Sequence, residues 1–265
     1  METISTDNVN VRGVTLVDNK LFVLLQRDVN QVAVYSINDY QLLCHLNLPY
    51  VMPDNHSDLT SCVRYKRIYM SDYANRCIHK YNLVGNATSK WEVGLPRANP
   101  ICLSVTPNCN LLVTCRQPSK LAELSATSGQ CVREIALQSD IDGPCHGVQL
   151  TSGQYVVCCV AFQCDSLHGV CIVDDDGKVT RSYGGQRGSH THQLNWPSHL
   201  AVDESSQFIF VADCFNDRVV MLSATLEFVR DIREGLSEPQ RLYLHHSTRR
   251  LYVGQWLGDV VVIQL

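Results

Sequence analysis

The sequence predicts an all-β fold of six similar units arranged in a closed ring. Short apolar runs separated by polar turns recur with a period of roughly 40–50 residues, four runs to a unit. The tetrapeptide Leu-Ser-Ala-Thr occurs at 124–127 and again at 222–225, at the same phase of two units. No window keeps the apolar spacing of an amphipathic helix. These observations are typical of a six-bladed β-propeller with four antiparallel strands in each blade.

Each unit opens with an apolar run that we expect to form the innermost strand of a blade. The six blades begin near residues 11, 58, 99, 144, 197 and 239. A second strand follows after a short polar turn, with its six copies centred on Phe22, Tyr69, Leu112, Val156, Phe210 and Tyr252. A third strand comes next, as at residues 219–222. Turns such as Asp174-Asp175-Asp176-Gly177 then suit a hairpin to the fourth strand.

The ends of the chain suggest how the ring closes. The last unit stops at Leu265, after its third strand, and residues 1–10 belong to no unit. Because open sheet edges invite aggregation, we expect residues 1–10 to supply the outer strand of the last blade. Residues 11–265 then form a single propeller domain. The alternative is a disordered N-terminal tail.

Composition limits the compartment and the class of partner. Most of the 13 cysteines lie in apolar runs, and the first residues lack the basic and apolar regions of a secretory signal. We therefore expect buried free thiols and a cytoplasmic protein. No apolar stretch approaches 18 residues, so no membrane span is expected. The net charge of −4 argues against a protein that coats nucleic acid.

Two stretches carry the motif of a known repeat. The first is Asn195-Trp196-Pro197-Ser198-His199-Leu200-Ala201-Val202-Asp203, followed by Asp213-Cys214-Phe215-Asn216-Asp217-Arg218-Val219. The second is Tyr69-Met70-Ser71-Asp72-Tyr73-Ala74-Asn75-Arg76-Cys77-Ile78. Both resemble the NHL repeat, and the chain is similar to the C-terminal propeller of TRIM-NHL proteins. The resemblance implies that the Asp and Asn side chains bind turn backbone, and that RNA binding is one activity to consider.

The starts of the innermost strands line the central channel of a propeller. Arg12, His146, His199 and Arg241 lie at such starts, together with Thr60, Ser61 and Cys102. Two histidines and two arginines at one channel mouth would form a site for an anion or a small molecule. The alternative is a set of solvated polar groups that line a water-filled channel.

His190, His192 and His199 have the spacing most suggestive of a metal site, since residues i and i+2 of a strand face one way. Their segment is rich in Gly and Ser, however, and no carboxylate or thiol is near in sequence. We therefore expect no metal and no cofactor. The sequence has no nucleophile elbow or phosphate loop, so we name no catalytic residue and favour a protein without enzymatic activity.

Basic residues concentrate in the second unit among tyrosines. The candidates are Arg64, Lys66, Arg67, Arg76, Lys80 and Tyr73. Basic groups interleaved with aromatic rings can hold single-stranded RNA through phosphate contacts and base stacking. The alternative is an ordinary solvated blade edge.

Three functions remain after these considerations. We favour a monomeric, non-catalytic propeller that binds a protein partner through its loops and one face of the disc. An RNA-binding NHL domain that uses the second blade is the first alternative. An enzyme or small-molecule binder at the channel mouth is the second.

Overall fold

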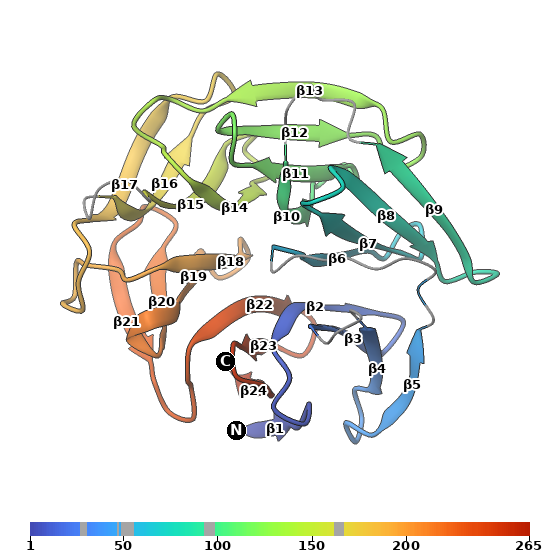
Figure 1. Ribbon diagram of the computed structural model, residues 1–265. Helices are drawn as coiled ribbons and strands as arrows, with labels where there is room; N and C mark the ends of the chain where they lie inside the picture. Colours follow the sequence, from blue (N-terminus) through green and yellow to red (C-terminus); the bar gives the residue numbers. More distant parts are fainter. Residues whose placement is uncertain (27–30, 47, 49–55, 93–98, 162–166) are drawn as a thin grey trace.

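The structure is a computed structural model that describes residues 1–265 except 27–30, 47, 49–55, 93–98 and 162–166. Six antiparallel sheets of four strands each are arranged around a central axis, as Figure 1 shows. The predicted fold class, a six-bladed β-propeller, is therefore confirmed. In the described part of the chain the one helical element is the 3-10 turn η1 (Cys214–Asn216). None of the described helices could cross a membrane.

In blades 1 to 5 the strands follow one another from the axis outward. The strands of blades 1 and 2 are β2 (Val11–Val17), β3 (Lys20–Leu25), β4 (Gln31–Ser36), β5 (Leu42–Leu46), β6 (Leu59–Cys62), β7 (Arg67–Asp72), β8 (Cys77–Asn82) and β9 (Ala87–Glu92). Those of blades 3 and 4 are β10 (Pro100–Val105), β11 (Leu111–Cys115), β12 (Lys120–Leu124), β13 (Cys131–Ala136), β14 (Pro144–Gln149), β15 (Tyr155–Val160), β16 (His168–Val173) and β17 (Val179–Gly185). Blade 5 contains β18 (Pro197–Asp203), β19 (Phe208–Asp213), β20 (Arg218–Ser223) and β21 (Phe228–Ile232).

Blade 6 is built from both ends of the chain. Its strands are β22 (Pro239–His245), β23 (Arg250–Gln255), β24 (Val260–Gln264) and, outermost, β1 (Glu2–Ile4). Glu2 pairs with Val262 and Ile4 with Val260, and the two termini lie close together in Figure 1. The side chain of Ile4 is buried among the apolar residues that join blades 6 and 1. The N-terminal strand therefore closes the ring.

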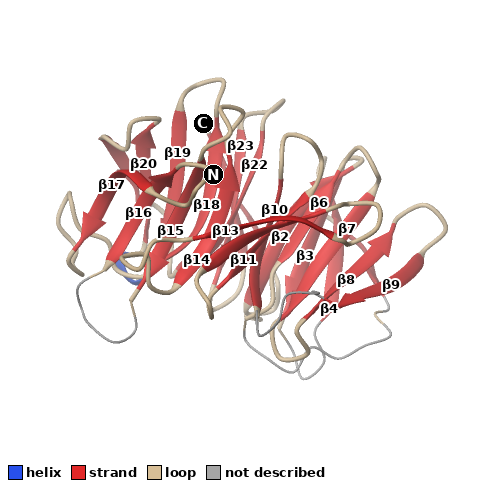
Figure 2. Cartoon of the chain, turned by 90° about the horizontal axis from the view of Figure 1, so that it is seen from above, coloured by secondary structure: helices blue, strands red, loops and turns tan. Residues whose placement is uncertain are grey.

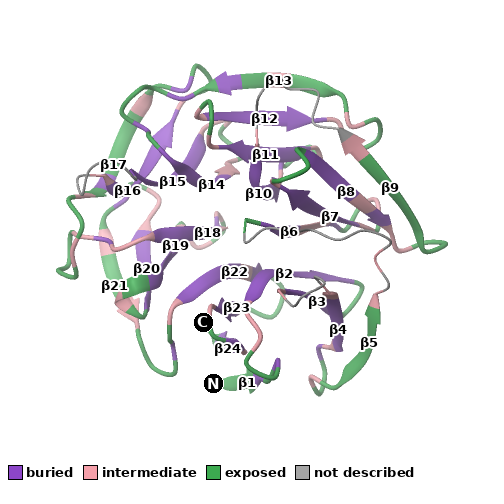
Figure 3. Cartoon of the chain, viewed as in Figure 1, coloured by how far each residue is buried: buried purple, intermediate pink, exposed green. Residues whose placement is uncertain are grey.

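The outermost strand of a blade is its most exposed strand, as Figure 3 shows. Strands β15 and β16 are buried at every residue, whereas most of β5 and β13 is exposed. Apolar side chains pack between neighbouring blades, so a middle strand has no face in water. This explains the cysteines in the apolar runs: Cys158 and Cys159 are completely buried, and every described cysteine is a free thiol.

The strands run between two faces of the disc, where the turns gather (Figure 2). We call the face at which the innermost strands begin the entry face and the opposite one the exit face. Each second strand runs antiparallel to the first, so the turns between second and third strands also lie on the entry face. The turns between first and second strands lie on the exit face.

Candidate functional site

One residue from the start of each innermost strand is buried at the axis. These six residues, which we call the channel ring, are Gly13, Asp58, Cys102, His146, His199 and Arg241. Five of them pair with a residue of the second strand of their blade, and Asp58, which directly precedes β6, accepts a hydrogen bond from the Ser71 N–H through its carbonyl oxygen. Gly13 pairs with Leu24, for example, and His199 with Ala212.

Ring side chains bind the backbone of the next blade. Asp58 Oδ2 accepts a hydrogen bond from the Leu103 N–H at 2.8 Å. His146 Nδ1 accepts one from Leu200 at 3.2 Å, and His199 Nδ1 one from Leu242 at 3.4 Å. In all three cases the donor directly follows the ring residue of the next blade. His146 and His199, which were predicted to belong to a ligand site, therefore join neighbouring blades.

Blades 6 and 1 are joined by an arginine. The Nε–H of Arg241 donates to the Arg12 carbonyl oxygen at 2.7 Å, and an Nη–H donates to the Ser57 carbonyl at 3.2 Å. Arg241 Nε also lies 3.2 Å from Asp58 Oδ1. This buried guanidinium is thus held by carbonyl groups and by a carboxylate.

The two ring histidines are neutral and stacked. Their ring centroids are 3.6 Å apart, with an interplanar angle of 14°. Each Nδ1 accepts a hydrogen bond, so the single ring proton is on Nε2, which in His146 donates to the Leu103 carbonyl oxygen at 3.3 Å. Burial, followed by the other imidazole, holds the pKa of His146 well below its usual 6.5, and burial also lowers the pKa of His199.

Asp58, which the sequence analysis missed, is the counter-charge of the ring. Burial alone would raise its pKa, but the interaction with His199 and the charge of Arg241 hold this pKa at about 2. The sequence does contain a signal, since Ser57-Asp58-Leu59 has the phase of Ser198-His199-Leu200. Thr60 and Ser61, taken as the channel residues of blade 2, lie further along the strand.

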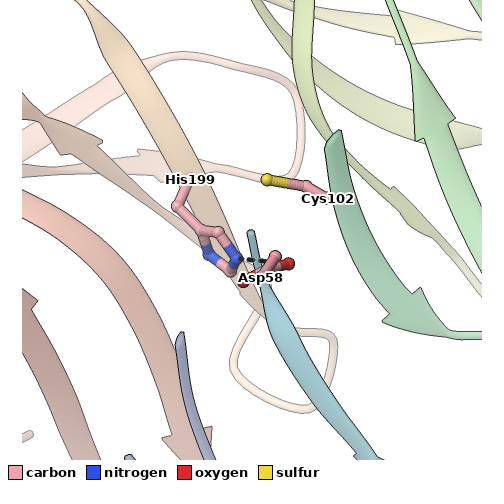
Figure 4. Close-up of side chains that lie close together, drawn as sticks. All are labelled: Asp58, Cys102 and His199. Carbon is pink, nitrogen blue, oxygen red and sulfur yellow. Dashed lines mark ion pairs between the residues drawn. The ribbon is translucent and has the colours of Figure 1, made fainter. Parts of the chain in front are cut away.

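Asp58, Cys102 and His199 have ligand atoms within 4.8 Å of one another, and Figure 4 shows their side chains converging. Their surroundings do not fit a metal ion. A metal-bound histidine normally donates its second ring N–H, whereas His199 Nδ1 accepts a hydrogen bond. Burial and the Asp58 charge raise the pKa of Cys102 well above 9.0, and the Arg241 charge opposes a cation.

A cavity of about 200 Å³ lies on the entry side of the ring. Three arginines, Arg12, Arg116 and Arg241, line it together with Trp196 and Trp256. None of the described lining residues carries a carboxyl group. Guanidinium groups beside aromatic faces suit an anionic group that has apolar neighbours.

β-Bulges supply much of the cavity wall. The innermost strands of five blades contain a register shift at their second residue, which leaves that residue without a partner in the ladder. A bulge re-aims the side chain of its extra residue. The five residues are Arg12, Ile101, Cys145, Ser198 and Gln240, and all of them line the cavity.

Arg12 is held firmly in this wall. Its Nε–H donates to Gln26 Oε1 at 2.6 Å, and an Nη–H donates to Gln240 Oε1 at 3.1 Å. The guanidinium carbon lies 4.4 Å from the ring centroid of Trp256. Arg12 is therefore preorganised beside an aromatic face, with only 2% of its surface exposed.

Trp196, the second tryptophan of the cavity, is held in place by contacts with blades 4 and 5. The Trp196 N–H donates to His168 Nδ1 at 2.8 Å, and the Trp196 ring lies 5.6 Å from the ring of Phe215. Trp196 has a φ of +65°, a left-handed conformation that is uncommon for a bulky residue. It lies directly before β18, on the entry face.

The predicted channel-mouth residues belong to two different features of the structure, the ring and the cavity. His146 and His199 belong to the ring, Arg12 lines the cavity, and Arg241 does both. Sequence reasoning missed Arg116, Trp196 and Trp256 as cavity residues, because they lie in turns outside the innermost strands. Burial raises the pKa of Cys145, as it does for Cys102, so neither lining thiol is activated.

The predicted RNA-binding residues lie at two ends of blade 2. Tyr73 and Arg76 lie in the β7–β8 turn on the entry face, whereas Arg64 and Lys66 lie in the β6–β7 turn on the exit face. Arg67 starts β7, and Lys80 lies within β8.

Arg64, Arg67 and Lys80 lie close to aromatic rings. The guanidinium carbons of Arg64 and Arg67 lie 5.8 and 5.3 Å from the Tyr65 centroid, and Lys80 Nζ lies 4.5 Å from the Trp91 centroid. Lys66 instead pairs with Asp18 of blade 1 at 3.0 Å. The predicted set is thus spread over both faces.

The three histidines of the metal hypothesis are not brought together. His190 and His192 are exposed in the loop between β17 and β18, whereas His199 is buried in the ring. The carbonyl oxygen of His190 accepts a hydrogen bond from Arg218, which fixes that loop against blade 5.

Comparisons with known proteins support the fold alone. No family model and no curated protein matches the sequence. A catalytically inactive virginiamycin B lyase from Staphylococcus aureus with quinupristin is 10% identical, with a TM-score of 0.66 over 96% of this chain and 81% of that one. The WD40 propeller domain of Doa1 is 14% identical, with a TM-score of 0.66 over 98% and 94%. The Cps50 (Swd1) propeller of Myceliophteria thermophila is 11% identical, with a TM-score of 0.63 over 97% and 84%. The chain is thus a six-bladed β-propeller, similar in fold to a lyase and to a WD40 domain.

Proposed function

We propose that this chain is a non-catalytic binding propeller that recognises a protein partner through its entry face. The cavity at the channel mouth takes an acidic side chain of that partner. The observation that carries the proposal is the placement of Arg12, Arg116 and Arg241 beside Trp196 and Trp256 in one cavity. Arginine and tryptophan are the residues that most often dominate the energy of protein interfaces.

The rim of the cavity supports a macromolecular partner. Phe215, 44% exposed, lies in η1 next to Trp196, and Leu257, 64% exposed, directly follows Trp256. Both lie in turns between second and third strands, and hence on the entry face. Apolar groups around a charged pocket can exclude water from a bound carboxylate, which strengthens its attraction to arginine.

The closed floor of the cavity favours an inserted side chain over a threaded strand. The ring residues are buried, and the His146–His199 stack occupies the axis. A separate cavity of about 120 Å³ lies along these rings toward the exit face. A group that enters from the entry face therefore ends at the ring.

The protonation of the site supports a non-catalytic role. The pKa values of Cys102 and Cys145 are raised, and each ring histidine uses Nδ1 to bind backbone. These groups are poorly suited to act as a nucleophile or a general base. An enzyme that uses the cavity remains the third hypothesis, because a lyase shares the fold.

Binding to an array of acidic, neutral and basic 12-residue peptides tests the proposal. We expect acidic peptides to be retained and Trp256→Ala or Arg116→Glu to reduce their affinity at least tenfold. Leu43→Ser, at an exposed position of the outer strand β5, is the matched control and should bind as the wild type does. Equal retention of basic peptides, or full binding by both cavity variants, would contradict the proposal.

RNA binding is the second candidate, and the contacts of Arg64, Arg67 and Lys80 with Tyr65 and Trp91 favour it. The NHL-like motifs point the same way. A fluorescent oligouridine should then bind with an affinity that falls steeply with salt, and the triple variant Arg64→Glu, Lys66→Glu, Arg67→Glu should abolish binding. Unchanged binding by that variant would show that RNA does not bind at these residues of blade 2.

We also propose that the chain works in the cytoplasm as a monomer. The described cysteines are free thiols, most of them buried, which suits a reducing compartment. Light scattering coupled to size-exclusion chromatography would test the monomer against 29.8 kDa.

A further inference from the structure

We propose that blade 2 contains a zinc site formed by Asp72, Cys77 and His79 at the β7–β8 hairpin. This site lies within the blade, outside the cavity of the proposed function. Blades 2 and 5 have the same turn between their second and third strands, but they hold its buried carboxylate differently.

In blade 5 the carboxylate is held by a cation. Asn216 Nδ2 donates to Asp213 Oδ2 at 2.8 Å, and the Arg218 Nε–H donates to the same oxygen at 2.6 Å. Asp213 is completely buried, and Arg218 is 2% exposed. A buried carboxylate is costly without an opposite charge, so the guanidinium is required in this position.

Blade 2 has the same turn, but different side chains approach its buried carboxylate. Asn75 Nδ2 donates to Asp72 Oδ2 at 2.9 Å, and the Asn75 N–H donates to Oδ1 at 2.9 Å. The position of Arg218 is occupied by Cys77. His79, two residues further along β8, points to the same face of the strand and places Nε2 2.8 Å from Asp72 Oδ2.

The three side chains have the geometry and chemistry of zinc ligands. Their ligand atoms lie within 4.8 Å of one another, and all three residues are buried. Cys77 Sγ lies 3.6 Å from His79 Nε2. Tetrahedral Zn²⁺ with a Zn–S bond of about 2.3 Å and a Zn–N bond of about 2.05 Å places these atoms about 3.6 Å apart.

One small movement would admit the ion. The same bond lengths require about 3.4 Å between carboxylate oxygen and imidazole nitrogen, so Asp72 and His79 must separate by roughly half an ångström. The ion replaces their direct hydrogen bond, Cys77 binds as the thiolate, and water completes the tetrahedron. A thiolate with an imidazole selects Zn²⁺ over Ca²⁺ or Mg²⁺, which prefer oxygen ligands.

The test uses the full chain purified from cells grown with zinc. Elemental analysis should find about one zinc per chain, and Co²⁺ added to the metal-free protein should give thiolate charge-transfer absorption near the ultraviolet. Cys77→Ser should lose both signals, whereas Cys44→Ser, at an exposed cysteine of β5, should keep them. Zinc should also raise the Tm of the metal-free wild type, because it binds the folded site.

A second variant keeps the inference falsifiable if Cys77→Ser unfolds. The double substitution Cys77→Arg, His79→Val copies blade 5, and it should fold without zinc and with a Tm that zinc does not change. The inference is overturned if the wild type binds neither Zn²⁺ nor Co²⁺. It is also overturned if Cys77→Ser binds them as the wild type does, since Asp72 and His79 would then form an ordinary hydrogen-bonded pair.

Discussion

At the scale of single residues, the channel ring shows that polar side chains at a propeller axis can hold blades together. Asp58, His146 and His199 each bind the backbone of the next blade. The sequence predicted that His146, His199 and Arg241 would meet at the axis. It could not reveal their partners in other blades, because these partners lie more than 40 residues away in the sequence.

Gly13 is the ring residue whose replacement we expect to be most damaging. A Cβ atom there would lie 2.3 Å from Leu59 Cβ and 2.6 Å from the Leu59 nitrogen, so blades 1 and 2 would have to separate. Gly13→Ala should lower the free energy of unfolding in urea by about 1–3 kcal/mol. Val84→Ala, at an exposed turn, should change it by less than about 0.5 kcal/mol. Equal changes in the free energy of unfolding for the two variants would contradict the close packing of blades 1 and 2 at Gly13.

The ring histidines should make stability depend on pH. Their pKa values are below 6.5 in the folded state, so the unfolded chain takes up protons that the folded chain does not once the pH falls through about 6.5. The free energy of unfolding should therefore decrease toward pH 5. Asp58, with its pKa lowered from 3.8 to about 2, contributes stability that is present above pH 3.8 and lost toward pH 2.

Thermal melts at pH 7.5 and 5.0 measure the contribution of the histidines. In His146→Gln the amide oxygen can still accept from Leu200, and the fall in Tm between the two pH values should be smaller than in the wild type. His192→Gln, in an exposed loop, should behave as the wild type does. An unchanged pH dependence in His146→Gln would show that the ring histidines do not cause the loss of stability at low pH.

At the scale of elements, strand order and turns decided which residues meet. The repeat predicted where the strands lie in the sequence, because the alternation of apolar residues is a local property. It did not reveal the bulges, which aim five side chains into one cavity, because a register shift depends on the pairing of two strands. The basic residues of blade 2 are neighbours in sequence, but the length of β7 separates Lys66 from Tyr73.

The closing strand β1 gives an element-scale prediction. Removal of residues 1–10 exposes the edge of β24 and takes Ile4 out of an apolar cluster. We expect the Tm to fall by about 5–10 °C in one cooperative transition. Scanning calorimetry measures this change. An unchanged Tm would show that the ring does not depend on its N-terminal strand.

At the scale of the whole molecule, the ring encloses its cysteines between blades. Of the described cysteines, Cys44 and Cys131 are exposed and Cys109 is half-buried, and the rest are buried. N-ethylmaleimide should therefore modify Cys44 and Cys131 first in the native protein, and mass spectrometry of the peptides identifies the sites. Rapid modification of Cys158 would show that blades 4 and 5 do not pack as described, and rapid modification of Cys159 would show the same for blades 3 and 4.

The seam between β1 and β24 also decides how the molecule responds to tension. Glu2 pairs with Val262 close to both termini, and Ile4 with Val260 further in. A force that separates Met1 from Leu265 therefore loads these pairs one after another, like a zipper, rather than all at once. Optical tweezers should record a first extension of a few residues at low force, before any blade unfolds. The ring would then have one weak point under load, and blade 6 would be the first to open.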